Sequence, residues 1–165
     1  RIRKKYKPKG IVALYYYYKY LLKLYTRNNI QYKLTPEMRT EVKKMDEYSE
    51  RIRFLCKYKI ETMSDVDNIK EQKKEELQKI LNIRNRLYYK RQKLDSEIEK
   101  DGVTKEIIDV TSALTKVRRE NKLCDEIYDG VPRMKEHIKE VDEREKQKIK
   151  EQEIKLKKKD RRYER

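Results

Sequence analysis

Apolar side chains recur at three- and four-residue steps along most of the chain, which predicts amphipathic helices. The first apolar face lies within residues 8–25 and consists of Ile11, Leu14, Tyr15, Tyr18, Leu22 and Tyr25. A second face follows the start signal Thr35-Pro36-Glu37 and continues to about Ile60. Its members are Met38, Val42, Met45, Tyr48, Ile52, Leu55 and Cys56. We therefore expect two short amphipathic helices in the first third of the chain.

Two longer helices are predicted next, joined by a short break at Asp101-Gly102. One runs from Asp65 to about Lys100 behind a cap at Ser64 and Asp67, and Thr104 caps the other, which runs toward Ile127. The seam of the first is Leu77, Ile80, Leu87, Leu94 and Ile98, interrupted by Arg84 and Arg91. The heptad positions of the second are Val103, Val110, Val117 and Cys124, with Ile107, Leu114 and Asn121. So short a connection favours an antiparallel hairpin, in which Asn121 would cost stability and help to fix the register.

Gly130-Val131-Pro132 is predicted to stop the last long helix. Residues 133–165 are charged at 23 of 33 positions, and pairs such as Glu140 with Arg144 support a solvated, fraying helix that ends in a disordered basic tail. The predicted fold is thus all-α and elongated. It comprises a basic, Tyr-rich arm and first helix (1–33), a second amphipathic helix (34–62), a coiled-coil-like helical hairpin (63–130) and a charged helical or disordered tail (131–165).

Composition restricts both the core and the chemistry. Leu, Ile, Val and Phe account for 37 of 165 residues, too few for a thick globular core, and three glycines and three prolines leave long helices uninterrupted. A single histidine, His137, argues against a Ser-His-Asp set and excludes a histidine-rich zinc site, and we expect it to be exposed. Cys56 and Cys124 lie on apolar helical faces, where they act as small hydrophobes. We therefore predict no catalytic residue, no metal site and no cofactor in this chain.

Charge is concentrated at the two ends. Residues 1–33 hold ten Lys or Arg and no acid, residues 34–132 hold 22 bases and 21 acids, and residues 133–165 hold 14 bases and nine acids. The balanced middle is typical of solvated helix faces. An acid-free basic segment attracts polyanions by neutralising phosphates and releasing counterions, so nucleic acid is the expected partner.

A second stripe of the first helix interleaves aromatic rings with cations. Tyr16 and Tyr20 can stack on unpaired bases while neighbouring cations meet phosphates. The predicted nucleic-acid-binding residues are Arg1, Arg3, Lys4, Lys5, Lys7, Lys9, Tyr16, Lys19, Tyr20, Lys23 and Arg27. A structural alternative is that each tyrosine only covers the core with its ring and leaves its hydroxyl in water. None of the fourteen tyrosines is expected to act as a nucleophile, because the run from Tyr15 to Tyr18 has only lysines nearby.

The apolar run from Ile11 to Tyr25 is also a candidate membrane element. It is about fifteen residues long, shorter than the roughly 20 needed to cross a bilayer, and Lys19 and Lys23 interrupt it. No small-residue cleavage site follows it, and two cysteines do not make a disulfide framework. We expect a cytoplasmic protein without stable membrane insertion, and peripheral binding to anionic lipid remains an alternative that vesicle flotation would test.

Four blocks of the sequence resemble, in order, the region that follows the catalytic domain in relaxase/mobilisation nucleases of conjugative plasmids and transposons. The blocks are residues 9–22, Met45-Asp46 through Ser49, residues 53–60 and residues 122–127, so the resemblance covers roughly residues 9–140. In that family an upstream domain nicks one DNA strand at a transfer origin with a tyrosine nucleophile and a histidine-bound divalent metal. The chain begins with Arg1 instead of Met, which fits a fragment cut from such a protein.

The resemblance implies a non-catalytic C-terminal region of a DNA-nicking relaxase. Such a region would contribute to conjugative transfer by binding single-stranded or transfer-origin DNA, mainly through phosphates, and by docking other conjugation proteins. The alternative is a coiled-coil module that pairs its seam with another protein and has no direct contact with nucleic acid.

Overall fold

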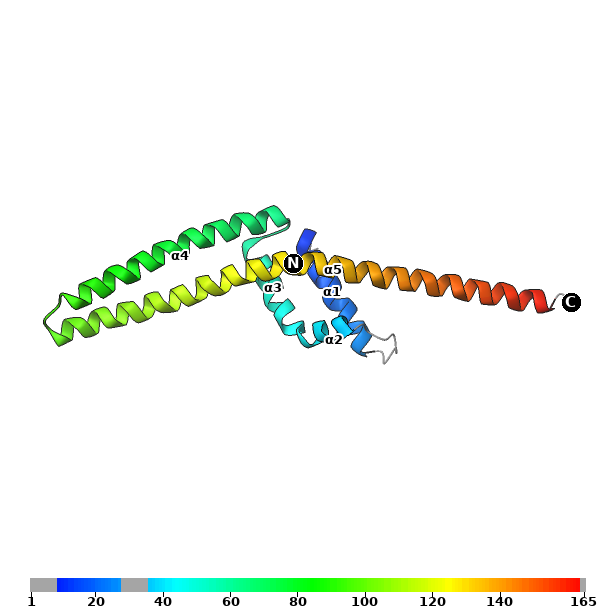
Figure 1. The fold of residues 1–165 in the computed structure, drawn as a ribbon, viewed down its shortest axis with the longest axis horizontal. Helices are drawn as coiled ribbons and strands as arrows, with labels where there is room; N and C mark the ends of the chain where they lie inside the picture. The colour runs from blue at the N-terminus through cyan, green and yellow to red at the C-terminus, as the bar shows by residue number, and fades with distance from the viewer. Residues whose placement is uncertain (1–8, 28–35, 164–165) are drawn as a thin grey trace, which may run out of the picture.

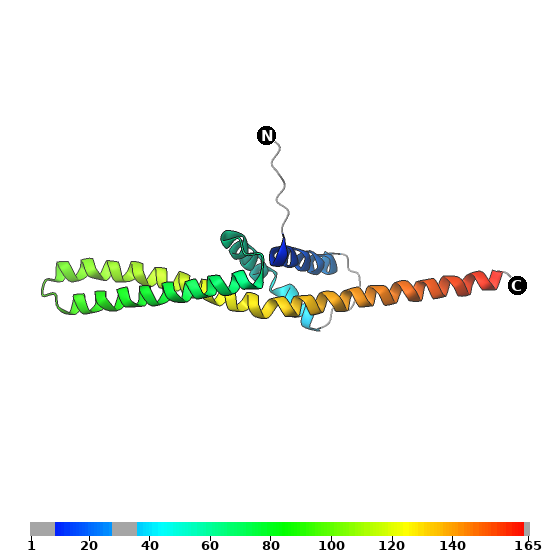
Figure 2. The same cartoon turned by 90° about the horizontal axis from the view of Figure 1, so that it is seen from above.

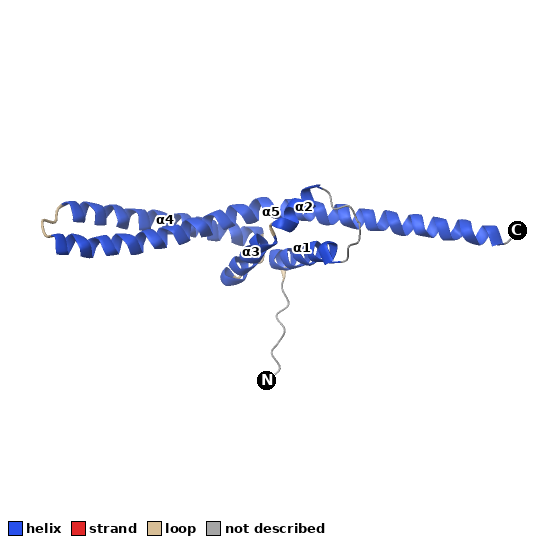
Figure 3. Cartoon of the chain, turned by 90° about the horizontal axis from the view of Figure 1, so that it is seen from below, coloured by secondary structure: helices blue, strands red, loops and turns tan. Residues whose placement is uncertain are grey.

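The computed structural model describes residues 9–27 and 36–163, with side chains described for residues 9–24 and 39–154. Its helices are α1 (Gly10–Arg27), α2 (Pro36–Lys43), α3 (Met45–Tyr58), α4 (Met63–Gln92) and α5 (Glu97–Tyr163). No strand occurs in the described part of the chain (Figure 3), so the predicted all-α class is confirmed.

The molecule is elongated around its longest helix. The first half of α5 lies antiparallel beside α4 and forms an arm with it, while the second half extends alone in the opposite direction (Figure 1). Helices α1, α2 and α3 gather beside the middle of α5, as the turned view in Figure 2 also shows. We call this central cluster, with the first residues of α4 and residues 123–141 of α5, the junction.

The junction contains the main hydrophobic core. Its fully buried side chains come from α1, α3, the α3–α4 connection, the start of α4 and the middle of α5: Val12, Tyr15, Tyr18, Leu22, Leu55, Ile60, Val66, Cys124, Ile127 and Met134. The inner face predicted for α1 is confirmed at Ile11, Tyr15, Tyr18 and Leu22, and Leu14 is half-buried against the same core. Three tyrosines supply much of this core, with Tyr48 of α3 packing edge-on to Tyr18 at a centroid distance of 5.6 Å.

Backbone geometry fixes where α1 begins. Gly10 has φ +55°, and the Ile11 amide donates to the Glu61 carbonyl at 2.9 Å, which ties the helix start to the α3–α4 connection. A Cβ at Gly10 would lie 2.0 Å from the Glu61 oxygen. Glycine is therefore required here both by its backbone conformation and by this close approach.

The second predicted helix is divided in the structure. A turn at Lys44 separates α2 from α3, so α2 packs against α1 while α3 packs against α1 and α5. Periodicity alone did not reveal this turn, because the apolar spacing continues across it. The predicted cap Thr35 lies outside the described residues.

Helix α4 begins at Met63, two residues earlier than predicted. Thr62 is the N-cap, its hydroxyl accepts from the Asp65 amide at 3.2 Å, and the Asp65 carboxylate accepts from the Thr62 amide at 2.8 Å. This capping box replaces the expected Ser64–Asp67 cap. The predicted position was wrong because two Ser/Thr-x-x-Asp patterns overlap here, and only one can begin the helix.

The hairpin turn lies at residues 93–96, and the predicted break at Asp101-Gly102 is wrong. Glu97 and Glu99 occupy the first turn of α5, where carboxylates favour the positive end of a helix. Gly102 is helical, a Cβ on it would meet nothing within 4 Å, and Thr104 donates to the Lys100 carbonyl at 2.7 Å inside the helix. Ile98 consequently leaves the predicted seam and is 85% exposed.

Helix α5 also continues through Gly130-Val131-Pro132, contrary to the predicted stop. An interior proline costs about 3 kcal/mol or more. The buried residues Ile127, Val131 and Met134 hold both sides of this segment in the junction core, which offsets that cost. A Cβ on Gly130 would lie 3.2 Å from the Tyr15 hydroxyl oxygen, so glycine serves here to admit a tyrosine and does not end the helix.

The arm has a thin seam. On α5 the heptad residues Val103, Ile107, Leu114 and Val117 are buried, as predicted, whereas Val110 and Asn121 are half-buried. The facing residues of α4, Leu77, Ile80, Arg84 and Leu87, are only half-buried, as is Leu94 in the hairpin turn. Beyond the arm, α5 remains helical to Tyr163, and Arg144 pairs with Glu140 at 3.8 Å as the i,i+4 spacing predicts.

Candidate nucleic-acid interface

The consecutive tyrosines of α1 divide between two faces of the helix. Tyr15 and Tyr18 are fully buried, whereas Tyr16 and Tyr17 are each 46% exposed and Tyr20 is 59% exposed. Helical geometry explains the division, because positions 15, 18 and 22 share one side of a 3.6-residue turn. The structural interpretation therefore applies to Tyr15 and Tyr18, whose rings are in the core. The rings of Tyr16, Tyr17 and Tyr20 are exposed and accessible to a ligand.

The buried tyrosines are held in a form unsuited to nucleophilic attack. Burial raises the pKa of Tyr15 to about 12, an increase opposed by the nearby Arg51 guanidinium. Burial also raises the pKa of Tyr18, whose hydroxyl lies 2.7 Å from His137 Nδ1. Both hydroxyls therefore stay protonated at neutral pH, which is the opposite of an activated nucleophile.

Tyr16, Tyr20 and Lys23 form an exposed stripe at i, i+4 and i+7 on the outer side of α1. Lys9, just before the helix, is exposed as well. Rings and an ammonium on one surface can receive a stacked base and its phosphate together. We call Tyr16, Tyr20 and Lys23 the α1 stripe.

Other predicted contact residues differ from this stripe. Lys19 is half-buried, and its Nζ donates to Ser49 Oγ of α3, so this lysine joins two helices of the junction. The side chain of Arg27 and all of Arg1, Arg3, Lys4, Lys5 and Lys7 lie outside the described residues. Tyr17 is exposed too, and burial raises its pKa, with a further contribution from the nearby charges of Asp142 and Glu145 on α5.

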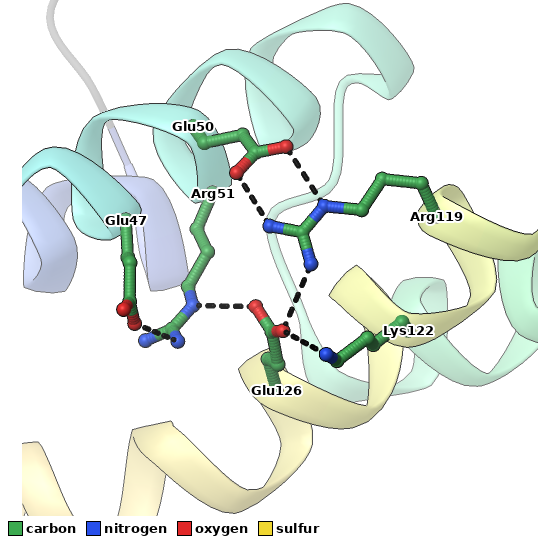
Figure 4. Close-up of polar contacts among 6 residues, drawn as sticks. All are labelled: Glu47, Glu50, Arg51, Arg119, Lys122 and Glu126. Carbon is green, nitrogen blue, oxygen red and sulfur yellow. Dashed lines mark hydrogen bonds and ion pairs between the residues drawn. The ribbon is translucent and has the colours of Figure 1, made fainter. Parts of the chain in front are cut away.

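An ion-pair network fixes α3 against α5 (Figure 4). Arg119 binds Glu50 through Nε at 3.0 Å and Nη2 at 2.5 Å, and its Nη1 donates to Glu126 Oε1 at 3.0 Å. Arg51, only 9% exposed, reaches Glu126 at 3.3 Å and Glu47 at 3.2 Å. Two arginines and three carboxylates thus lock the orientation of the helix on which α1 rests.

A second polar cluster lies where α3, α4 and α5 meet. Glu120 accepts from Lys57 at 2.6 Å and from the Tyr58 hydroxyl at 2.8 Å, and it pairs with Lys73 at 2.9 Å. Burial alone would raise the pKa of Glu120, but these three hydrogen bonds lower it to about 2. The expectation that charges in the middle of the chain are solvated is therefore wrong for Glu120 and Lys73, whose side chains are 18% and 13% exposed and connect α5 to α4.

His137 is buried, which corrects the expectation that it is exposed. It is 8% exposed and stacks on Tyr18 with a centroid distance of 6.1 Å. The apolar face of α5 continues past Pro132 through Ile127, Val131, Met134, Ile138 and Val141. This spacing could have indicated that His137 lies in a buried helix. The burial was missed because Gly130-Val131-Pro132 was interpreted as the end of the helix.

The cysteines behave differently from each other. Cys124 is buried, as predicted, and burial raises the pKa of its thiol to about 11. Cys56 is exposed, so its predicted place on the apolar face is wrong. Within residues 9–27 and 36–163, no group of three His, Cys, Asp or Glu side chains is placed to hold a metal ion.

No protein-family model, curated protein or solved structure matches this chain significantly. Each helix in the described part of the chain is too short or too polar to cross a membrane.

Proposed function

We propose that the chain is a non-catalytic nucleic-acid-binding module whose α1 stripe contacts single-stranded DNA. The observation that carries this proposal is the division of α1: Tyr15 and Tyr18 anchor the helix in the core, while Tyr16, Tyr20 and Lys23 stay outside. Ion pairs fix α3 to α5, and α1 packs on α3, so the exposed rings of α1 lie on a rigid support. Such a support limits the entropy lost when a base stacks on it.

The acid-free basic segment that precedes α1 strengthens this proposal. Residues 1–9 carry six cations and no acid, so a strand bound at Tyr16 and Tyr20 would meet a strongly positive flank. In the wider proposal this module follows the catalytic domain of a DNA-nicking relaxase in the cytoplasm. There it holds the strand near a transfer origin and docks other transfer proteins, without a metal or cofactor of its own.

The coiled-coil alternative requires a seam that is free to pair with another protein. Val103, Ile107, Leu114 and Val117 are instead buried between α4 and α5 of the same chain. A partner-binding function would therefore need another surface. Sedimentation over a concentration series separates the two functions, since a hairpin whose seam is filled internally stays monomeric.

The test of the α1 stripe is a comparison of two tyrosine variants. Fluorescence anisotropy with a labelled single-stranded oligonucleotide should show a loss of about tenfold in affinity for Tyr16→Ala and again for Tyr20→Ala, since base stacking contributes about 1–3 kcal/mol per base. Tyr17→Ala is the matched control, because it removes an equally exposed ring that lies near the charges of Asp142 and Glu145.

Salt dependence completes this experiment. The affinity of the unmodified chain should decrease steeply between 50 and 200 mM salt, about 0.7 logarithmic units per phosphate contact for each tenfold increase in salt. Absence of binding, an affinity independent of salt, or an equal loss for Tyr17→Ala and Tyr20→Ala would each contradict the proposal.

A further inference from the structure

The far end of the arm carries a second concentration of positive charge. Residues 77–94 hold six cations and no acid: Lys79, Arg84, Arg86, Lys90, Arg91 and Lys93. This run is invisible when charge is averaged over residues 34–132, because acids elsewhere in that stretch balance it. It lies in α4 and the following turn, at the end of the arm that points away from the junction (Figures 1 and 2).

The helical geometry sorts these cations into two groups. Lys79, Ile83, Arg86, Lys90 and Lys93 follow one another at alternating steps of four and three residues, so they form one stripe along α4. All five are exposed, and Tyr89 beside them is 67% exposed. We call Lys79, Arg86, Tyr89, Lys90 and Lys93 the tip stripe.

Arg84 and Arg91 belong to the other group. Arg84 is half-buried in the seam against α5, and Arg91 contributes, after Lys100, to lowering the pKa of Glu97 at the start of α5. By contrast, the structure records no ion pair for Lys79, Arg86, Lys90 or Lys93 among the residues it describes. Arg84 and Arg91 thus interact with α5, whereas the other four cations of this run are exposed and form no ion pair recorded in the described part of the chain.

We propose that the tip stripe is a second binding surface for the phosphate backbone of single-stranded nucleic acid, on which Tyr89 stacks a base. Four cations spaced along about 21 Å of α4 and its C-cap match a polyanion, whose charges also repeat along a line. An exposed ring among them supplies the aromatic contact typical of surfaces that bind single strands. Nothing in the junction covers this surface, because α1, α2 and α3 lie at the other end of the arm.

The charge pattern favours nucleic acid over other anionic partners. A membrane-binding helix needs a broad apolar face below its cations. Here Ile83 is the one exposed aliphatic residue among the cations of the tip stripe, and the leucines of α4 are half-buried. A second copy of the chain is the main competing partner, since Asp95 of the hairpin turn and Glu97, Glu99 and Asp101 at the start of α5 could attract the tip stripe of a neighbour.

The first test neutralises the stripe in the full chain. The variant combines Lys79→Gln, Arg86→Gln, Lys90→Gln and Lys93→Gln, and its control combines Lys105→Gln, Lys116→Gln, Arg118→Gln and Lys135→Gln, four exposed cations of α5. Because the stripe variant can no longer neutralise four phosphates, its slope of log affinity for single-stranded DNA against log salt should become less negative by about 3. The control should change this slope by less than about 1.

The second test removes the ring alone. Tyr89→Ala should lower affinity by about tenfold, whereas Tyr128→Ala, which removes a 51% exposed tyrosine from α5, should leave it unchanged. Circular dichroism confirms that each variant keeps its helices. The two proposals can be tested separately. An unchanged affinity in Tyr20→Ala would contradict the proposed contact at α1, and an unchanged affinity in Tyr89→Ala would contradict the proposed contact at the tip stripe.

Three results would overturn the assignment of the tip stripe. One is an equal change of salt slope in the stripe variant and its control. Another is sedimentation in which the unmodified chain self-associates, the stripe variant is monomeric, and DNA affinity is the same for both. The third is flotation of the unmodified chain with vesicles containing phosphatidylserine, lost in the stripe variant, while binding to DNA does not change.

Discussion

The junction and the arm are built from similar helices but stabilised differently. The junction buries aromatic and aliphatic side chains from four helices and supports them with ion pairs between α3 and α5. The arm has one seam, buried on α5 and only half-buried on α4. The difference shows that a chain with few hydrophobic residues concentrates its stability where helices cross, and leaves the rest as an extended support with most of its surface exposed.

The largest expected effect is that of a cavity in the junction. Leu55 is fully buried, so Leu55→Ala should destabilise the chain by about 3 kcal/mol. Leu87→Ala, at a half-buried position in the arm, should cost about 1 kcal/mol. Urea unfolding followed by circular dichroism measures both changes. Equal losses would mean that the arm contributes as much as the junction to the cooperative unit.

A smaller effect concerns acid, and it depends on Glu120. The folded chain lowers the pKa of this carboxyl to about 2, so its ion pairs stabilise the fold above the ordinary pKa of 4.5 and are progressively lost as pH falls toward 2. After screening, the loss should be about 1–2 kcal/mol. Thermal melting between pH 6 and pH 2 should show a weaker acid dependence for Glu120→Gln than for the unmodified chain.

Glu106→Gln is the control for this measurement, because Glu106 is an exposed carboxylate of the arm. It should leave the acid dependence of the melting temperature unchanged. The same slope in Glu120→Gln and the unmodified chain would show that the cluster of Lys57, Tyr58 and Lys73 around Glu120 does not stabilise the folded state.

The smallest effect uses two helical glycines. Gly102→Ala should stabilise the arm by about 0.5–1 kcal/mol, because the new methyl group meets nothing within 4 Å and the unfolded chain loses freedom. Gly130→Ala should gain less, since its methyl group would press on the Tyr15 hydroxyl at 3.2 Å. Thermal melts of the two variants compare them directly, and a larger gain at Gly130 would mean that Tyr15 can move away freely.

Local periodicity predicted the parts of the fold in which one helix face repeats without interruption. It identified the buried side of α1 and the heptad residues of α5, because both depend only on spacing along the chain. It failed at Gly102 and at Gly130-Val131-Pro132, where residues that usually end helices are kept helical by their surroundings. Such a tertiary effect cannot be read from the neighbouring residues alone.

The candidate site shows the same limit. The outward position of Tyr16, Tyr20 and Lys23 follows from the pattern, whereas the contact of Lys19 with Ser49 joins residues 30 positions apart. The burial of His137 beside Tyr18 joins residues 119 apart. The cationic run of residues 77–94 could have been found, since it needs only a shorter window for counting charge.

The unbroken course of α5 has a consequence for changes in length. Each residue of an α-helix advances about 1.5 Å and turns about 100°, so the 67 residues of α5 extend about 100 Å without a flexible joint. One residue inserted between Val117 and Leu123 would rotate everything beyond it by that angle, and Ile127, Val131 and Met134 would swing out of the core. An insertion of seven residues nearly restores the angular phase, so α5 should tolerate the addition of a heptad better than the addition of a single residue.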